Sequence, residues 1–520
     1  MKVTTLKKYG SILLIIFLGI SCDDFLDVNE DPNLPSVVPT EDRLIGAIRA
    51  TNGASQWRAT REVSAVVQYG TTRNTTGGFF NAETWRFTSS YFFWQNAYTW
   101  AIPNAVDLIV LGEDNDLPEF IGAGKVLQAL NFGMLTDQYG SIVVKDSYDG
   151  RSQVNLTPEF DEQEVVYEEI FRILDEAIEA FRQVDNNTSA LNNSNGDILY
   201  QGDIQKWEKF AWSLKARYLN HLSKKSNLYD SSAIIEAANN GFNGDGMDAE
   251  FNYTSGGLQT AENPWFSWGG FTNPDNPRYF TWNHFFVNIL TTFPVTENDF
   301  QDPRISRIME SAPSDGEYRG LRSGMGLEGG EGGSGEFTDE SDYGRFSDSG
   351  FYTRVDSPFP FITYSEVKLI EAEARLRSGD AQGALEAFEE GVRANMRKLD
   401  VSINEIEEYW VALVNDGLIT HFNDLNEGLS HIMRQKYITQ ALNPETWVDM
   451  RRMDYSQEIY GPSLQRPFNL NTIIFDPNNE DDWIRAMIYE GNEEVRNPSN
   501  LPDNTPSTRL RTPVWWDVQE

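Results

Sequence analysis

Amphipathic helical periodicity runs through most of this chain, and it restricts the fold more than any other feature of the sequence. Between Gln163 and Arg182, apolar side chains recur at spacings of three and four residues, and charged side chains occupy the opposite positions. This pattern predicts a helix that packs on one face. Similar stretches cover residues 90–111, 120–139 and 205–224, separated by segments rich in Asn, Gly and Asp. Such turn residues between helices predict a fold of repeated helical hairpins.

The composition changes near Asn240. From there to about Ser357 the chain is dense in Gly, Asn, Pro and aromatic residues, and it includes the glycine-rich run Gly326–Glu336. Sequence of this kind favours loops. Helical periodicity resumes at Thr363, and the tail from Tyr455 to Glu520 is again irregular and Pro-rich.

We therefore predict a mainly α protein in which residues 40–520 form a single domain. Its helical scaffold would cover about 40–240 and 360–450, and a loop-rich part would cover about 241–359 and 455–520.

The chain is strongly acidic. Its 79 Asp and Glu residues outnumber 42 Lys and Arg residues, and the formal net charge is −37. Such a surface repels polyanions, and no clustered basic patch offsets it, so we exclude nucleic acid as a ligand. The chain is long enough to bury a large core, and its single cysteine leaves no internal disulfide. Packing alone must hold the fold.

The N-terminus has the pattern of a lipoprotein signal peptide. Three lysines precede an apolar stretch at residues 12–18, and Gly-Ile-Ser then leads to Cys22. A spanning helix needs about 18 or more apolar residues, so we predict that residues 1–21 are a cleaved signal peptide. Lipid chains on Cys22 would then anchor the protein. The alternative is an ordinary secreted protein with an incidental cysteine.

Residues 22–39 form an acidic, proline-containing tether behind the predicted lipid. Asp23, Asp24 and Asp27 follow the cysteine, and acidic residues there resemble the surface-export signal of Bacteroidetes lipoproteins. We therefore expect a lipid-anchored protein on the outer surface of the outer membrane.

The segment from Ala372 to Met396 resembles a tetratricopeptide repeat unit. Gly379 ends its first helix, Ala384 and Gly391 are small residues where helices cross closely, and Phe388 fills the groove between the helices. Taken alone, the segment is equally typical of any helical hairpin.

The whole mature chain resembles the SusD/RagB family of Bacteroidetes outer-membrane lipoproteins. Five segments carry this resemblance in the order of the family: residues 128–144, 207–223, 361–380, 432–452 and the terminal VWWD at 514–517. The VWWD ending looks closest to the SusD-like branch of the family.

This resemblance implies a tetratricopeptide-like fold and a carbohydrate-binding protein that is not an enzyme and needs no cofactor. It also implies a partner, a SusC-like TonB-dependent transporter of the outer membrane, for which the protein would act as a hinged lid. The helical half would face the transporter, and the loop-rich half would bind the glycan.

Sugars have apolar faces and polar rims, so a glycan site combines aromatic rings with amides and carboxylates. Two loops offer both: residues 77–85 and residues 262–282. The candidate glycan-binding residues are Trp85, Trp265, Trp268, Phe271, Asn81, Asn263, Asn273 and Asp275. A stacked ring would contribute on the order of 1 kcal/mol beyond burial. The structural alternative is that these tryptophans fix their loops to the scaffold.

Motifs for catalysis and metal binding are absent from the sequence. The four histidines lack the spacing of a zinc site, and neither a nucleophile elbow nor a phosphate-binding loop occurs. Residues 243–250 offer oxygen ligands for a structural calcium ion, but their spacing does not follow the EF-hand loop. We therefore predict no catalytic residue and no metal ligand, with calcium at 243–250 as the alternative.

Three functions stay open after the sequence analysis. The first is capture of a glycan, for which the overall negative charge favours a neutral polymer such as a laminarin-like β-glucan. The second is capture of peptides by the same scaffold, as in RagB-type relatives. The third is a surface glycoside hydrolase, because two carboxylates suffice for that chemistry and acids are abundant here.

Overall fold

The computed structural model describes residues 38–520, except 74–77, 88–91, 186, 194–195, 257–260, 269–279, 293–300, 328–336 and 338–339. The predicted signal peptide and Cys22 lie outside the described residues. Within the described residues, none of the helices combines the length and the apolar character that crossing a bilayer requires.

Long helices form in the two stretches where the sequence shows helical periodicity, and the prediction of a mainly α protein is confirmed. The predicted helix at Gln163–Arg182 is α8, with the same bounds. The helices of the first stretch are α2 (Thr40–Ala50), α3 (Trp57–Val66), α6 (Ile102–Asp114), α7 (Pro118–Tyr139), α8, α9 (Ile204–His221) and α10 (Ser231–Asn240). Those of the second are α14 (Tyr364–Arg377), α15 (Ala381–Lys398), α16 (Ile403–Asn415), α17 (Leu418–His421), α18 (Leu425–Thr439) and α19 (Glu445–Arg452).

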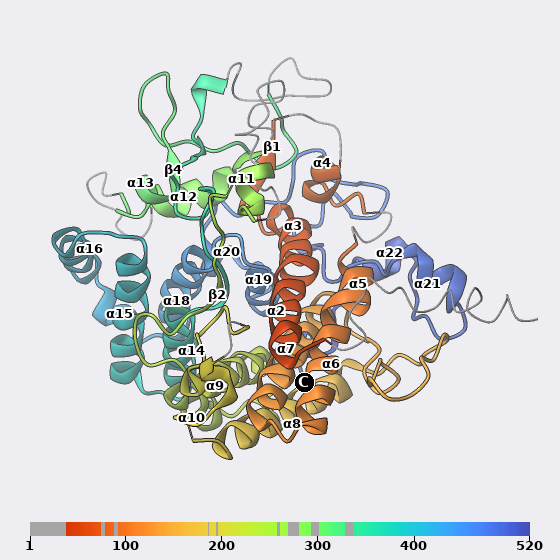
Figure 1. The fold of residues 1–520 in the computed structure, drawn as a ribbon. Coiled ribbons are helices and arrows are strands. Elements are labelled where there is room, and N and C mark those ends of the chain that lie inside the picture. The colour runs from red at the N-terminus through yellow and green to blue at the C-terminus, as the bar shows by residue number, and fades with distance from the viewer. Residues whose placement is uncertain are drawn as a thin grey trace, which may run out of the picture.

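Consecutive helices pack against one another along the chain. Helix α6 contacts α7, α7 contacts α8, α8 contacts α9, and α10 joins the two stretches by packing on α14. In Figure 1, α6–α10 (orange to yellow) lie in the lower part, α2 and α3 (red) lie at the centre, and α14–α16 (teal) lie at the left. This arrangement is the predicted series of helical hairpins.

The hairpin α14–α15 shows why its small residues are needed. Gly379 has a φ of +85° in the turn, which favours glycine, and the Asp380 side chain caps α15 by accepting from the Gly383 amide. A Cβ at Gly391 would lie 2.9 Å from Leu369 Cγ. The two helices approach too closely there for a larger side chain.

The segment between α10 and α14 is mostly loop, as predicted. Its strands form short antiparallel pairs. Strand β3 (Phe280–Trp282) pairs with β1 (Gly70–Thr72) from the first stretch, β2 (Ala249–Phe251) pairs with β6 (Phe359–Ile362), and β4 (Met309–Glu310) pairs with β5 (Arg345–Phe346). Register partners include Gly70 with Trp282 and Thr72 with Phe280. The portion of this segment that carries β4 (green) lies at the top of Figure 1.

Short helices complete the chain. They are α4 (Gly78–Glu83), α5 (Phe93–Asn96), α11 (Pro264–Trp268), α12 (His284–Thr292), α13 (Ile305–Ile308), α20 (Gln457–Tyr460), α21 (Gly491–Arg496) and α22 (Pro506–Arg509), with the π-helices η1 (Thr51–Gln56) and η2 (Ala97–Ala101) and the 3₁₀ turns η3 (Ala190–Asn193), η4 (Leu222–Lys224), η5 (Glu340–Asp342) and η6 (Trp515–Asp517). One continuous hydrophobic cluster extends from Leu44 in α2 to Trp516 in η6. The irregular C-terminal tail is therefore packed into the same core as the helices.

Candidate functional site

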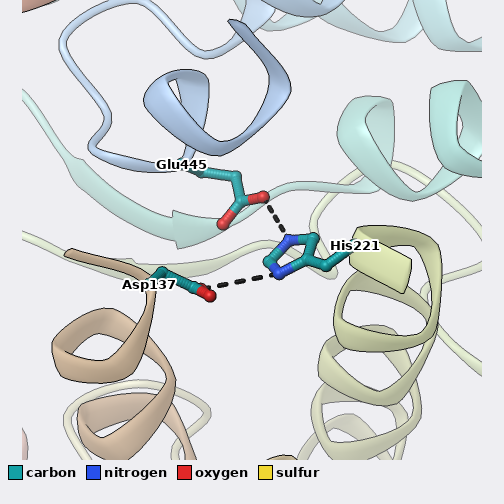
Figure 2. Close-up of side chains that lie close together, drawn as sticks. All are labelled: Asp137, His221 and Glu445. Carbon is teal, nitrogen blue, oxygen red and sulfur yellow. Dashed lines mark hydrogen bonds and ion pairs between the residues drawn. The ribbon is translucent and has the colours of Figure 1, made fainter. Parts of the chain in front are cut away.

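A cluster of ionisable side chains lies buried where three helices meet. His221 ends α9, Asp137 lies in the last turn of α7, and Glu445 begins α19 (Figure 2). His221 Nε2 lies 2.6 Å from Glu445 Oε1, and His221 Nδ1 lies 3.5 Å from Asp137 Oδ2. Tyr167 links His221 to Asp137, because its hydroxyl lies 2.9 Å from His221 Nδ1 and donates to Asp137 Oδ1 at 2.5 Å. We call Asp137, His221, Glu445 and Tyr167 the polar centre.

The polar centre holds its histidine in the charged form. Burial lowers the pKa of His221. The carboxylates of Glu445 and Asp137 raise it by more than burial lowers it, from 6.5 to about 9. Both ring nitrogens of an imidazolium donate, one to Glu445 and the other to the Tyr167 hydroxyl. The histidine is therefore the cation between two carboxylates.

This geometry argues against a metal centre at the same residues. Asp137, His221 and Glu445 offer ligand atoms within 4.8 Å of one another. A zinc ligand, however, must be a neutral imidazole about 2.0–2.1 Å from the ion, and here the ring holds its proton between two acceptors. The adjoining cavity has a volume of about 10 Å³, room for about one water. The arrangement has no space for a substrate.

Further buried ion pairs extend the polar centre between the helices. Arg217 pairs with Glu366 at 2.6 Å, and Arg452 pairs with Glu373 at 2.8 Å and with Asp449 at 2.5 Å. The exposed fraction of each of these side chains is below 5%. A buried charge is tolerated when it is paired in this way.

All five segments that carry the family resemblance meet at this network. The first contributes Asp137, the second Arg217 and His221, the third Glu366 and Glu373, and the fourth Glu445, Asp449 and Arg452. The terminal VWWD contributes Trp516, whose Nε1 donates to Asp137 Oδ1 at 3.0 Å. The resemblance thus lies in the internal structure of the scaffold and not in a ligand site.

Two of the predicted stacking residues belong to the hydrophobic core. Trp85 is fully buried, with ring centroids 5.0 Å from Phe475 and 5.4 Å from Trp483. Trp265 is 1% exposed and packs edge-on against Trp57 at 5.0 Å. Neither ring has a face open to a sugar in this structure. The structural alternative, in which these rings fix their loops to the scaffold, describes both.

The remaining candidates divide into two groups. Asn263 is fully buried and holds the start of α11, because its Nδ2 donates to the Ser357 carbonyl and its Oδ1 accepts from the Trp265 amide. Asn81 is half-buried in α4. The Trp268 side chain and the residues Phe271, Asn273 and Asp275 lie outside the described residues.

An open groove lies in the loop-rich part, on residues that the sequence analysis did not select. Its volume is about 200 Å³, and its lining includes Gln68, His284, Arg322, Ser323, Arg466 and Phe468. We call it the loop groove. Phe468 is 50% exposed, so its ring offers a face to a ligand.

Hydrogen bonds between segments far apart in sequence hold the groove walls together. The Phe468 amide donates to the Ser323 carbonyl at 2.8 Å, and Gln68 Nε2 donates to the Gln465 carbonyl at 2.6 Å. Gly324 has a φ of +76°, and a Cβ there would lie 3.2 Å from the Phe468 main chain. The groove is therefore preformed by the main chain.

Glu83 ties the groove to the adjacent sheet. It accepts from the Thr71 hydroxyl at 2.6 Å and from the Thr72 amide at 3.2 Å, both in β1, and also from the Gly324 main chain. Burial raises the pKa of Glu83 to about 8, although these hydrogen bonds lower it.

The groove has the chemistry of a sugar site. An exposed ring suits the apolar face of a pyranose, and amides and guanidinium groups suit its hydroxyls. Phe468 lies in the Pro-rich tail, between Pro467 and Asn469, which is the same kind of composition that pointed to residues 77–85. This composition is the sequence signal that could have identified Phe468. The sequence analysis places residues 455–520 in the loop-rich part but names no binding residue among them.

A second, larger cavity of about 340 Å³ includes the predicted calcium segment. Asp245, Asp248 and Glu250 line it together with Arg397 and Lys398. The Lys398 ammonium donates to both Asp248 and Glu250, and Arg397 Nε donates to Asp245 at 2.7 Å. Because protein cations already compensate these carboxylates, we do not propose calcium there. We call this cavity the charged cleft.

Comparison with solved structures places the fold. A SusD/RagB family protein from Bacteroides thetaiotaomicron is 20% identical, with a TM-score of 0.71 over 93% of this chain and 100% of that one. A chitin-binding SusD homologue from Flavobacterium johnsoniae is 19% identical, with a TM-score of 0.72 over 92% of this chain and 99% of that one. A SusD homologue from Bacteroides uniformis is 20% identical, with a TM-score of 0.68 over 93% and 100%. These likenesses establish the tetratricopeptide-like fold.

No curated protein matches the chain significantly. Residues 32–468, however, match the SusD-like family described as starch-binding and associating with the outer membrane. This match covers most of the chain, and the predicted relationship is confirmed. The chain belongs to the SusD-like family.

Proposed function

We propose that this protein is a cell-surface lipoprotein that captures oligosaccharides or polysaccharides in the loop groove. The observation that carries the proposal is the half-exposed ring of Phe468 in a preformed groove that Arg466 and Gln68 also line. A chitin-binding protein shares the fold, and the family is described as starch-binding. Both support a glycan as the ligand class.

We further propose that the protein passes its ligand to a SusC-like TonB-dependent transporter and acts as its lid. The family relationship supports this partner, and lipid chains on Cys22 would hold the protein at the same membrane. Extraction in mild detergent should recover the protein with a β-barrel partner. Recovery alone, from cells that produce the barrel, would contradict the proposal.

The overall charge of the chain favours a neutral glycan such as a laminarin-like β-glucan. Affinity should be modest, with a Kd between about 1 μM and 1 mM, because an importer must also release its cargo.

Isothermal titration of the mature protein with oligosaccharides and with oligopeptides tests the ligand class. We expect heat from at least one oligosaccharide, and a loss of about fivefold to tenfold in affinity in Phe468→Ala, as expected when a stacking ring is removed. Binding of peptides alone would favour the RagB-type alternative. Release of reducing ends during prolonged incubation would favour the hydrolase.

A further inference from the structure

We infer that the loop groove selects acidic glycans, whose carboxylate or sulfate groups it binds through Arg466, with Arg322 on the same groove. The inference rests on the proposed function, because it assigns a substrate class to the proposed glycan site. It differs from the neutral glycan that the overall charge favours.

The charge of the groove is opposite to that of the protein. Acidic residues outnumber basic ones by 79 to 42 in the chain. Along the groove, however, the described lining residues include two arginines and a histidine and contain neither Asp nor Glu. Arg322 and Arg466 come from two separate segments, so the arginines of the lining do not belong to one stretch of sequence.

Arg466 is held in place without a carboxylate. Its Nη1 donates to the Asp476 carbonyl at 2.8 Å and, more weakly, to the Asp482 carbonyl at 3.5 Å, and its Nη2 donates to the Pro477 carbonyl at 2.9 Å. Among the described residues, it forms no ion pair. Main-chain carbonyls fix its orientation while the full positive charge stays uncompensated.

The two acids that provide these carbonyls use their side chains elsewhere. The Asp482 carboxylate accepts from Arg511 Nε at 2.8 Å and from the Asp476 amide at 2.8 Å. The Asp476 carboxylate accepts from the Asn478 amide at 2.9 Å. Neither carboxylate forms an ion pair with Arg466, so an anion on a ligand would be its first direct counter-charge.

The position of Arg466 suits an acidic sugar. Only Pro467 separates it from Phe468, and both residues line the groove. A pyranose stacked on the ring could therefore present its carboxylate or sulfate to the guanidinium. A planar guanidinium matches both groups with paired hydrogen bonds.

The net charge of the protein and the arginines of the groove act on an acidic glycan over different distances. At physiological ionic strength the Debye length is about 8 Å, so the net charge of −37 is largely screened at distances beyond it. A contact with Arg466 at hydrogen-bond distance is screened far less. The overall charge should slow the approach of an acidic glycan, and the groove should determine its affinity.

Isothermal titration at physiological salt, with oligosaccharides of equal length, tests the inference. The probes are an oligogalacturonate, a sulfated galactan oligomer, a laminari-oligosaccharide and a chito-oligosaccharide. We expect at least one acidic probe to bind about tenfold or more tightly than either neutral probe. The carboxylated and sulfated probes show which anion the groove prefers.

Three variants identify the residues responsible. Arg466→Gln should weaken the acidic probe about tenfold to a hundredfold and leave any neutral binding within about twofold, because it removes one charged hydrogen-bonding group. Arg466→Lys, which keeps the charge but loses the planar fork, should have an intermediate effect. Phe468→Ala should weaken every probe that stacks. Thermal unfolding of each variant checks that it is folded.

The possible failures are distinguishable. Tighter binding of a neutral probe, weakened in Phe468→Ala and unchanged in Arg466→Gln, would overturn the acidic preference and keep the proposed glycan function. Equal effects of Arg466→Gln on acidic and neutral probes would also overturn it. If no saccharide of either charge binds to folded protein, both the inference and the proposed function are wrong.

Discussion

The polar centre and the loop groove use charged residues in opposite ways. In the polar centre and the ion pairs that extend it, every cation faces carboxylates: His221 faces Asp137 and Glu445, and Arg452 faces Glu373 and Asp449. In the groove, Arg466 faces only main-chain carbonyls. Charges that are paired inside the protein stabilise the fold and are closed to a ligand. A fixed charge without a counter-charge at an open groove is available to one.

The largest expected effect comes from breaking a pair in the buried network. Arg452→Ala leaves buried Glu373 without its nearest cation and leaves buried Asp449 with Lys436 as its remaining partner, and it should reduce the free energy of unfolding by about 3–5 kcal/mol. Urea unfolding measures the loss. The control Arg172→Ala removes exposed pairs within α8 and should cost less than about 1 kcal/mol. Similar losses of unfolding free energy in both variants would show that the buried ion pairs of Arg452 matter no more for stability than the exposed ion pairs of Arg172.

A second large effect should separate stability from binding. Trp265→Ala removes a fully packed ring and should destabilise the protein by about 3–5 kcal/mol. Because its ring faces are covered by protein, the folded variant should keep the glycan affinity of the parent protein. Titration of refolded variant, at a temperature where it is folded, checks this. A large loss of affinity without a loss of stability would restore Trp265 as a stacking residue.

The pH dependence of stability should report the polar centre. His221 has an ordinary pKa of 6.5 and a pKa of about 9 in the folded protein, so the folded state binds the proton more tightly. The stabilisation is fully present below pH 6.5 and is lost as the pH rises through 9. Its size is about 3 kcal/mol on the scale of 1.36 kcal/mol per pKa unit.

A difference curve isolates this contribution. Glu83, with a pKa of about 8, also makes stability fall as the pH rises, but from 4.5 to 8. The unfolding free energy of the parent minus that of His221→Gln should therefore decline mainly between pH 6.5 and 9. A flat difference over that interval would show that His221 is neutral in the folded protein.

Helical periodicity predicted the scaffold well because it records which face of each helix is buried. The helix at Gln163–Arg182 has its predicted bounds, and the hairpin around Gly379 and Gly391 follows from the turn and from the close approach of its helices. These features depend on neighbours in the sequence or on one packing face. They can be read without knowledge of the remaining fold.

The binding residues could not be predicted in the same way. Composition shows that Trp85 and Trp265 lie in sequence without helical periodicity, but whether such a tryptophan faces solvent depends on distant residues such as Phe475 and Trp57. Likewise, the groove joins Gln68, Ser323 and Phe468, which are far apart in sequence. The sequence indicates that aromatic loops exist, and only the tertiary contacts decide which rings stay exposed.

The smallest expected effect compares the charged cleft with the loop groove. Arg397→Gln removes the partner of Asp245 in the charged cleft, where both side chains are partly exposed, and should change stability by less than about 1 kcal/mol. It should leave the affinity for an acidic oligosaccharide unchanged, because the cleft already balances its cations with Asp245, Asp248 and Glu250. Arg466→Gln should differ in binding, because it should clearly weaken the acidic oligosaccharide. If instead Arg397→Gln lowers the affinity for the acidic oligosaccharide as strongly as Arg466→Gln, the charged cleft also binds glycan. An arginine that is paired with a carboxylate would then be as available to a ligand as one that is not.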